Sequence, residues 1–305
     1  MSHAQQAQIS SEVCFVQAYA KINLTLDVLR RRTDGYHELA TVMQTIDLHD
    51  TICLTTTNDQ RVQVFCTTPA LSNNDNLAAR AVDMVRQHFA LRQGVRIELY
   101  KRIPTAAGLG GGSSDAAAVL LALRQWWQLQ LSPSDLLSMA ASLGSDVPFF
   151  LTGGTALCEG RGEQITPLAH HWPASMRWLL LLKPSISLST AAVFRDLLAS
   201  DYTDGTFSKT VCSALRANGA LQLEHLHNCL ERGVWERYPS VNQAREDLLS
   251  AGAQVVRLSG SGPTLYAPFA ELSSALHAQH HLQALGYEVY LSRAMNPNPG
   301  DVCLY

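Results

Sequence analysis

The sequence predicts an α+β protein with two lobes divided near residue 170, and three observations support this prediction. The chain has 305 residues, the size of one large domain or of two ordinary ones. Clusters of strand-like segments are mixed with segments of helical periodicity. Residues 168–174, with paired histidines and a proline, have the composition of a linker.

The composition indicates a folded, soluble protein. Hydrophobic residues make up 47% of the chain and charged residues 16%, which argues against intrinsic disorder. The formal net charge of −3 predicts no nucleic-acid partner and no membrane surface. Residues 1–11 lack the pattern of a signal peptide, and the longest apolar run, 116–123, is far shorter than the ~20 residues of a membrane span. The seven cysteines are scattered and never spaced C-x-x-C, so we expect a reducing, cytoplasmic location.

The expected elements of the first lobe follow from spacing and punctuation. Apolar and β-branched segments bounded by turn residues predict strands at 13–29, 41–57, 62–67, 95–99 and 155–159. Apolar residues at helical spacing predict a helix at 76–89, and an Ala/Leu-rich run predicts another at 114–127. Ser132 and Pro133 are typical cap and first-turn residues of a further helix, which Gly144 ends.

The same reasoning applies to the second lobe. Strands are expected at 178–182, 255–258 and 289–291. Helices are expected at 191–198, 211–215, 241–251 and 274–285. The predicted domains are residues 12–168 and 169–296, and no role is predicted for the tail 296–305.

The glycine-rich segment 104–114 is the most informative part of the chain. It comprises Pro104, Thr105, Ala106, Ala107, Gly108, Leu109, Gly110, Gly111, Gly112, Ser113 and Ser114. Its glycines permit positive φ angles and a close approach to a ligand, and Ser113 or Ser114 can cap the following helix, whose amino end attracts anions. No lysine follows the loop and Ser113 replaces the last glycine of G-x-G-x-x-G, so two familiar nucleotide motifs are absent. On its residues alone, the segment predicts either a phosphate site or a flexible turn.

The loop resembles the nucleotide loop of the GHMP small-molecule kinases. Residues 20–24 are similar to the amino-terminal motif of that superfamily, and residues 258–264 to its carboxy-terminal glycine motif. This resemblance implies a two-lobed fold with the active site in the cleft between the lobes. It also implies ATP as co-substrate on residues 104–114 with Mg²⁺ on its phosphates, and Asn76 and Lys101 as weaker nucleotide contacts. Ligands of the metal are not identified, apart from a loop serine as a candidate.

Two further segments, 34–39 and 144–150, are similar to the 4-diphosphocytidyl-2-C-methyl-D-erythritol kinases, a family of the non-mevalonate isoprenoid pathway. The resemblance implies that Asp146 is the general base and that Lys21 keeps it ionised. The remaining implied residues contact a substrate that carries a cytidine diphosphate group. Tyr36 and Phe194 would stack on cytosine, His37 would bind its polar edge, and Asn23 and Thr190 are weaker candidates.

Each of these residues also has a structural interpretation. Asp146 fits a turn after a helix, Lys21 an edge strand, and Tyr36 the turn that any D-G dipeptide predicts. Phe194 shares an expected helix with apolar residues and could belong to the core. His277, His280 and His281 are expected on a solvated helix face, and residues 30–32 in a solvated basic run.

Two alternative functions remain open at this point. The first is another GHMP kinase of a small alcohol, such as mevalonate or homoserine. Tyr36 and His37 argue against it, because those substrates have no base to stack. The second is a non-catalytic ligand-binding module, against which Lys21 and Asp146 argue.

Overall fold

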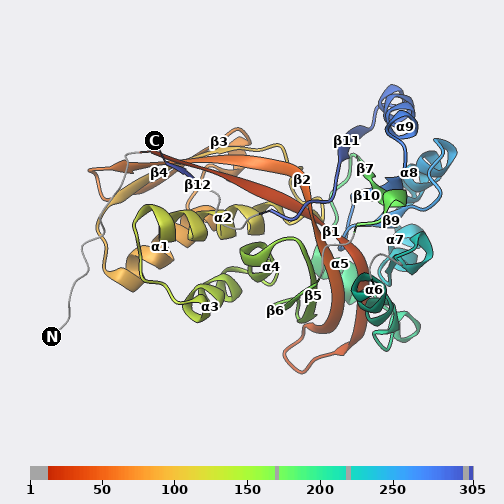
Figure 1. Ribbon diagram of the computed structural model, residues 1–305, viewed down its shortest axis with the longest axis horizontal. Coiled ribbons are helices and arrows are strands. Elements are labelled where there is room, and N and C mark those ends of the chain that lie inside the picture. The colour runs from red at the N-terminus through yellow and green to blue at the C-terminus, as the bar shows by residue number, and fades with distance from the viewer. Residues whose placement is uncertain (1–12, 169–171, 218–220, 298–301, 305) are drawn as a thin grey trace.

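The computed structural model describes residues 13–168, 172–217, 221–297 and 302–304, and Figure 1 shows two lobes side by side. Strands β1 (Val13–Arg31) and β2 (His37–Thr57) run the length of the amino-terminal lobe and curl toward the other lobe. The α+β fold with two lobes is therefore confirmed. In the described ranges, no helix combines the length and the apolar character that a membrane span requires.

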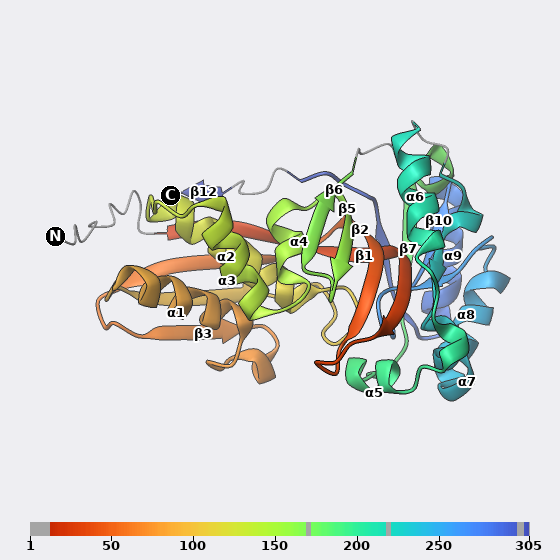
Figure 2. The same cartoon turned by 90° about the horizontal axis from the view of Figure 1, so that it is seen from below.

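The amino-terminal lobe is a curled sheet with helices on one face (Figures 1 and 2). The sheet order is β12–β1–β2–β4–β3, with β12 at Val302–Leu304, β4 at Gly94–Tyr100 and β3 at Val62–Cys66. β5 (Thr155–Gly160) pairs with β2 and with β6 (Gln164–Pro167), and β8 (His227–Asn228) pairs with β1. The helices are α1 (Leu77–Phe89), α2 (Gly111–Trp126), α3 (Pro133–Leu143) and α4 (Val147–Thr152).

The carboxy-terminal lobe is built on a smaller sheet. Its order is β11–β7–β10–β9, with β11 at Glu288–Ser292, β7 at Trp178–Lys183, β10 at Leu265–Phe269 and β9 at Arg257–Leu258. Its helices are α5 (Thr190–Arg195), α6 (Thr206–Arg216), α7 (Glu231–Arg237), α8 (Pro239–Ser250) and α9 (Leu272–Ala284). Helix α6 packs against β1 and β2, so it connects this lobe to the large sheet.

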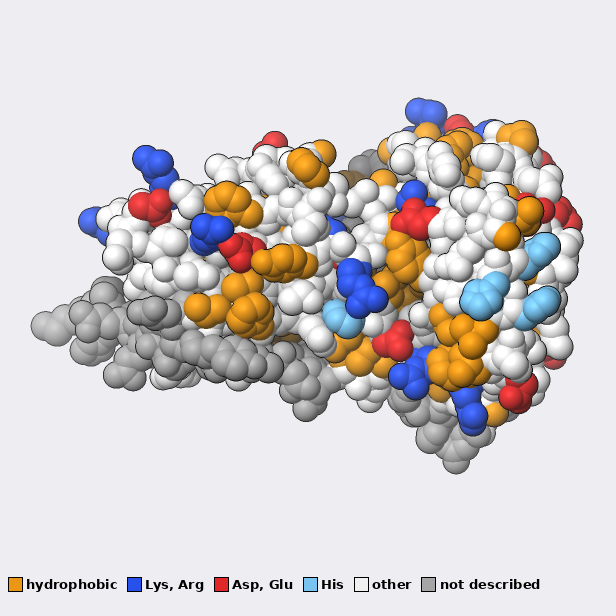
Figure 3. Space-filling model, turned by 90° about the horizontal axis from the view of Figure 1, so that it is seen from above, with side chains coloured by type: hydrophobic (Ala, Val, Ile, Leu, Met, Phe, Trp, Pro, Cys, Tyr) orange, Lys and Arg blue, Asp and Glu red, His pale blue; other side chains and the backbone are white. Residues whose placement is uncertain are grey.

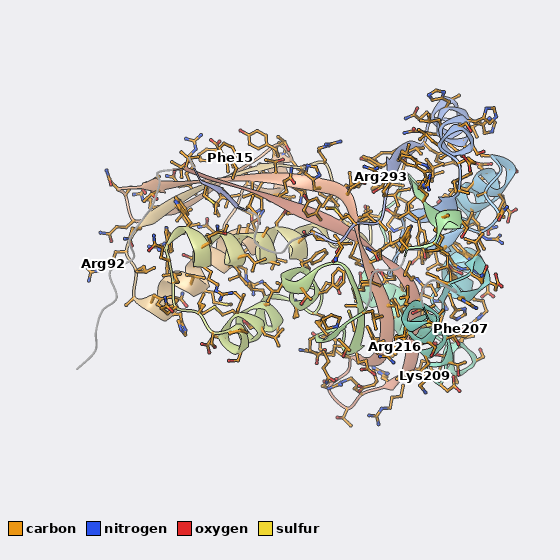
Figure 4. The ribbon with its side chains drawn as sticks, in the orientation of Figure 1. Phe15, Arg92, Phe207, Lys209, Arg216 and Arg293 are labelled. Carbon is orange, nitrogen blue, oxygen red and sulfur yellow. The ribbon has the colours of Figure 1, made fainter. Side chains whose placement is uncertain are left out.

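A shared apolar core joins the two lobes. Ile22 and Leu24 of β1 belong to the same buried cluster as Leu181 of β7 and Tyr266 of β10. Arg293 lies near this junction (Figure 4). It pairs with Asp47 of β2 at 3.4 Å, and its guanidinium lies over the ring of Trp178. The long strands therefore contribute to the packing of both lobes. The bounds 12–168 and 169–296 stay a prediction, and residues 12 and 169 lie outside the described ranges.

The carboxy-terminal tail contributes a strand to the large sheet, for which its sequence predicted no role. Strand β12 lies at the sheet edge, antiparallel to β1. Upstream of it, the Met295 N–H donates to the Thr45 carbonyl at 3.0 Å, and Pro297 approaches Gly153. This part of the chain therefore returns from the second lobe to the first.

Several elements differ from their expected bounds. Helix α2 begins at Gly111 rather than 114, because Gly110 is the N-cap and the last two glycines already adopt helical geometry. Helix α6 begins at Thr206 rather than 211, since Phe207 is the one large apolar residue in its first five positions and gives no helical periodicity. Helices α4 and α7 and strand β10 were not predicted; Pro268 makes β10 atypical of a strand. The helix Pro133–Leu143 between Ser132 and Gly144 is confirmed.

Candidate active site

A cavity of about 1060 Å³ lies between the lobes and is lined by residues of both. The first lobe contributes residues of the glycine loop, the β1–β2 turn and the segment before α4, including Gly112, Tyr36 and Asp146. The second lobe contributes Thr190, Phe194 and the glycine motif around Gly260. The cavity therefore brings together segments that are far apart in the sequence.

The glycine loop ends at the amino terminus of α2. Gly108 and Gly110 have φ angles of +76° and +72°, in the region that favours glycine. A Cβ on Gly108 would lie 2.2 Å from the Ser259 carbonyl oxygen, and one on Gly110 would lie 2.7 Å from the ring of Phe150. The first turn of α2 lacks a side-chain cap, and its N–H groups have no acceptor within the helix. Gly111, Gly112 and Ser113 line the cavity, and N–H groups at a helix amino end are suited to binding an anion.

Three predicted loop features differ from expectation. Neither Ser113 nor Ser114 caps α2, because the helix begins before them. Ser114 lies outside the cavity lining, and its hydroxyl donates to the Tyr19 carbonyl at 2.6 Å, which fixes α2 to β1. The side chain of Leu109 belongs to the apolar core between the lobes rather than to the cavity.

Lys21 and Asp146 meet in this cavity. The Lys21 ammonium lies 3.9 Å from an Asp146 carboxylate oxygen and donates to Asn23 Oδ1 at 2.7 Å. Asn23 in turn donates to the Thr41 hydroxyl at 2.8 Å. Burial lowers the pKa of Lys21, and the negative charge of Asp146 opposes that shift. The pair is thus a buried lysine beside a carboxylate whose side chain is 35% exposed.

Local backbone geometry positions both members of this pair. The β1–β2 register shifts between Tyr19 and Lys21 and again between Asn23 and Thr25, and such irregularities redirect side chains near functional sites. Asp146 is the N-cap residue of α4 but accepts no capping hydrogen bond. Its carboxylate therefore does not cap α4.

Lys101 and Asn76 line the cavity, but their polar groups are engaged within the protein. Lys101 Nζ lies 2.5 Å from Asp50 and 2.5 Å from Asp115. Burial would lower the pKa of Lys101, but the two carboxylates raise it; burial also raises the pKa of Asp115 to about 7. Asn76 caps α1 by accepting from the Ala78 N–H and donates to the Leu71 carbonyl at 3.0 Å. These contacts give both residues a structural role.

Part of the cavity lining is aromatic. The ring of His37 lies 5.4 Å from that of Phe194 and 6.1 Å from that of Tyr202. Tyr36 is 54% exposed, and the Arg161 guanidinium lies 4.9 Å from its ring centre. Burial and the neighbouring Arg31 lower the pKa of His37, which favours the neutral form of its ring.

The structure adds residues that the sequence did not reveal. Tyr202 and Arg161 line the cavity, and Ser261 shares a hydrogen bond of 2.8 Å with the predicted Thr190. The only sequence signal for Arg161 is its place between Gly160 and Gly162, which indicates a turn. Among the described residues, no group of three or more His, Cys, Asp or Glu side chains is arranged to hold a metal ion.

Comparisons with known proteins agree with this geometry. The family models of the GHMP kinases N terminal domain and of the GHMP kinases C terminal match residues 76–154 and 209–288.

A 4-diphosphocytidyl-2-C-methyl-D-erythritol kinase of Brevibacillus brevis is 38% identical over 289 residues, 94% of this chain and 98% of that protein. A crystal structure of 4-(cytidine 5'-diphospho)-2C-methyl-D-erythritol kinase has a TM-score of 0.79 and 32% identity, covering 93% of this chain and 100% of that one. A homoserine kinase from Cytophaga hutchinsonii has a TM-score of 0.73 at 18% identity over 97% of this chain and 99% of that one, which shows a common fold alone. The chain therefore belongs to the 4-diphosphocytidyl-2-C-methyl-D-erythritol kinase family of the GHMP kinases.

Proposed function

We propose that this kinase transfers the γ-phosphoryl group of ATP to the 2-hydroxyl of 4-diphosphocytidyl-2-C-methyl-D-erythritol, in the non-mevalonate route to isoprenoid precursors. One observation carries the proposal. The Lys21–Asp146 pair shares a cavity with the anion site of α2 and with the aromatic group of Tyr36, His37 and Phe194. The cavity thus offers a phosphate site, a reacting centre and a surface for a flat base.

Asp146 accepts the proton of the 2-hydroxyl as that oxygen attacks the γ-phosphorus. The bond from the γ-phosphorus to the β,γ-bridging oxygen breaks, and ADP leaves with its electron pair. Lys21, oriented by Asn23, keeps the Asp146 carboxylate ionised through the electrostatic attraction between them.

The N–H groups of Gly111, Gly112 and Ser113 bind the phosphates of ATP, helped by the positive end of the α2 dipole. Mg²⁺ prefers oxygen ligands and usually combines few protein ligands with substrate phosphates. The Ser113 hydroxyl in the cavity lining fits that chemistry and would hold the ion together with ATP. When bound, Mg²⁺ supplies charge neutralisation on the phosphates.

The substrate end of the cavity binds the cytidine group. Tyr36 and Phe194 provide aromatic faces for the base, and the neutral ring of His37 pairs with its polar edge. Asn23 and Thr190 also line the cavity and contact the rest of the substrate. The need for ATP and the scattered cysteines support a cytoplasmic location.

The experiment that tests the proposal measures ATP consumption with three alcohols: the cytidyl substrate, mevalonate and homoserine. We expect turnover with the cytidyl substrate only. Turnover with either of the other alcohols would instead assign the chain to another GHMP activity. Binding of ATP and of the cytidyl substrate without phosphoryl transfer would identify a non-catalytic module.

A further inference from the structure

Arg161 is a charged residue of the cavity for which neither the sequence nor the proposed mechanism gives a role. It lies in the turn between β5 and β6, between Gly160 and Gly162, both of which have positive φ angles. Its guanidinium lies 4.9 Å from the ring centre of Tyr36, and its Nε is 4.0 Å from a Glu163 carboxylate oxygen. The side chain keeps 32% of its exposure and lines the cavity. The side chain is therefore held by Tyr36 and Glu163 and is accessible to a ligand in the cavity.

Arg161 lies close to the residues proposed to bind each end of the substrate, Asp146 and Tyr36. A Cβ built on the adjacent Gly162 would lie 3.9 Å from Asp146 Oδ1, so the turn touches the reacting centre. The guanidinium itself extends toward Tyr36, which forms the stacking surface for the base. In the substrate, the diphosphate connects the cytidine to the branched alcohol. A cation that contacts Tyr36 and belongs to a turn beside Asp146 is therefore placed near the part of the substrate that carries the negative charge.

Of the other cations in the cavity lining, which also includes Arg31, Lys21, Lys101 and Arg195 are less suited to this task. Lys21 is paired with Asp146, and Lys101 is held by Asp50 and Asp115. Arg195 is 74% exposed and pairs with the adjacent Asp196 at 3.4 Å. The contact of Arg161 with Glu163 is the long one at 4.0 Å, so its N–H groups have capacity for a further acceptor.

We propose that Arg161 is a specificity-determining residue that binds the diphosphate of the cytidyl substrate while its planar face rests on Tyr36. The inference rests on the proposed function, because it concerns the same substrate. A guanidinium can stack through its face and donate through its edge at the same time, and its fork of N–H groups matches phosphate oxygens. The ammonium of a lysine provides charge without either of these geometries.

The direct test is calorimetric titration of cytidine, CMP and CDP into the wild-type protein and Arg161→Gln. In the wild type, affinity should rise with each added phosphate. In Arg161→Gln, the affinity for CDP should fall by about 10- to 100-fold, the scale of lost hydrogen bonds to a charged group. The affinity for cytidine should change less than threefold, and Arg161→Lys should be intermediate for CDP.

Arg96→Gln is a matched control. Arg96 lies over the ring of Phe65 at 4.3 Å and pairs with Glu98, two residues along the chain, as Arg161 does with Tyr36 and Glu163. It belongs to β4 and is not part of the cavity lining. Its substitution removes the same kind of contacts elsewhere and should leave all three affinities unchanged.

Two results would overturn the inference. Equal losses of cytidine and CDP affinity in Arg161→Gln would show that Arg161 only supports Tyr36. Unchanged CDP affinity would show that it does not contact the diphosphate. Kinetics separate these outcomes from a wrong function: Arg161→Gln should raise KM for the cytidyl substrate and leave KM for ATP unchanged. A wild-type protein that neither binds CDP nor phosphorylates the cytidyl substrate would instead refute the proposed function.

Discussion

Single residues of the site derive their properties from contacts with other segments. The Lys21 ammonium is surrounded by the β1–β2 sheet and the segment before α4, and burial would favour its neutral form. The Asp146 carboxylate and the Asn23 amide oxygen supply the interactions that favour its charged form. The chemistry of the pair thus depends on the contact between Lys21 and Asp146, which lie far apart in the sequence.

Asp146→Asn should lower kcat by about 10²- to 10⁴-fold, because the amide cannot accept the hydroxyl proton. ATP affinity should remain close to wild type, since the phosphate site of α2 is unchanged. Steady-state kinetics with titration of ATP measure both. Asp83→Asn, at a half-exposed carboxylate on α1, is the control. A kcat above about a tenth of wild type would contradict the assignment of Asp146 as the base.

Tyr36→Ala should raise KM for the cytidyl substrate roughly 10- to 100-fold, from the ~1–3 kcal/mol that stacking of one base contributes. The effect on kcat should be smaller, because the base is remote from the reacting hydroxyl. Tyr36→Phe keeps the ring and should be mild. Tyr100→Ala, at another exposed tyrosine, is the control. An unchanged KM in folded Tyr36→Ala would argue against the cytosine-binding role.

At the scale of elements, two strands and one helix end define the site. On β1, apolar side chains such as Ile22 and Leu24 alternate with buried polar ones such as Lys21 and Asn23. The apolar side joins the core between the lobes, and the polar side brings Lys21 to the Asp146 carboxylate, which comes from the segment before α4. Helix α2 contributes its amino end, where glycines leave the N–H groups accessible.

Gly112→Val should weaken ATP binding with little effect on folding. A Cβ at Gly112 would have Leu77 Cδ1 as its nearest neighbour at 3.8 Å, so the free protein has room for it. The same side chain would stand in the space that the phosphates require. This makes Gly112 a better test than Gly110, where a Cβ would lie 2.7 Å from Phe150.

Calorimetry of ATP binding with a thermal unfolding curve measures this prediction. Gly233→Val on α7, where no atom lies within 4 Å of the new Cβ, controls for the general cost of valine in a helix. Unchanged ATP affinity in a folded Gly112→Val protein would show that the first turn of α2 does not hold the phosphates.

At the scale of the whole molecule, the lobes are joined by a common core rather than by a linker alone. Tyr266 of β10 is fully buried, and its hydroxyl donates to the Asn23 carbonyl of β1 at 2.9 Å. On the face in Figure 3, basic and acidic side chains of the described residues are interspersed, as the small net charge predicts. No single sign of charge dominates this face.

Tyr266→Phe should lower the free energy of unfolding by about 1–3 kcal/mol, because the buried Asn23 carbonyl loses its partner. Urea denaturation measures the change. Tyr287→Phe removes a hydrogen bond of 2.6 Å to Asp247 within the second lobe and should cost less, since water can reach that site. Equal or greater stability of Tyr266→Phe would contradict the view that this bond joins the lobes.

The sequence by itself determined the α+β class, most strands and helices, the glycine loop and its kinship with the GHMP kinases. The helices and strands follow from local periodicity and from caps such as Ser132, which involve neighbouring residues, whereas the kinship follows from the resemblance of three short motifs. Helix α4 and strand β10 escaped this reasoning because short, proline-containing segments give weak local signals.

The tertiary structure alone decided which side chains meet. It places Lys21 beside Asp146, commits Lys101 to Asp50 and Asp115, and sets Arg161 over Tyr36. Such contacts join residues far apart in the chain, and they form because burying the shared apolar core fixes the sheet, α2 and the second lobe in one arrangement. Local propensities carry no information about that arrangement, so the charge state and accessibility of each site residue follow from the fold.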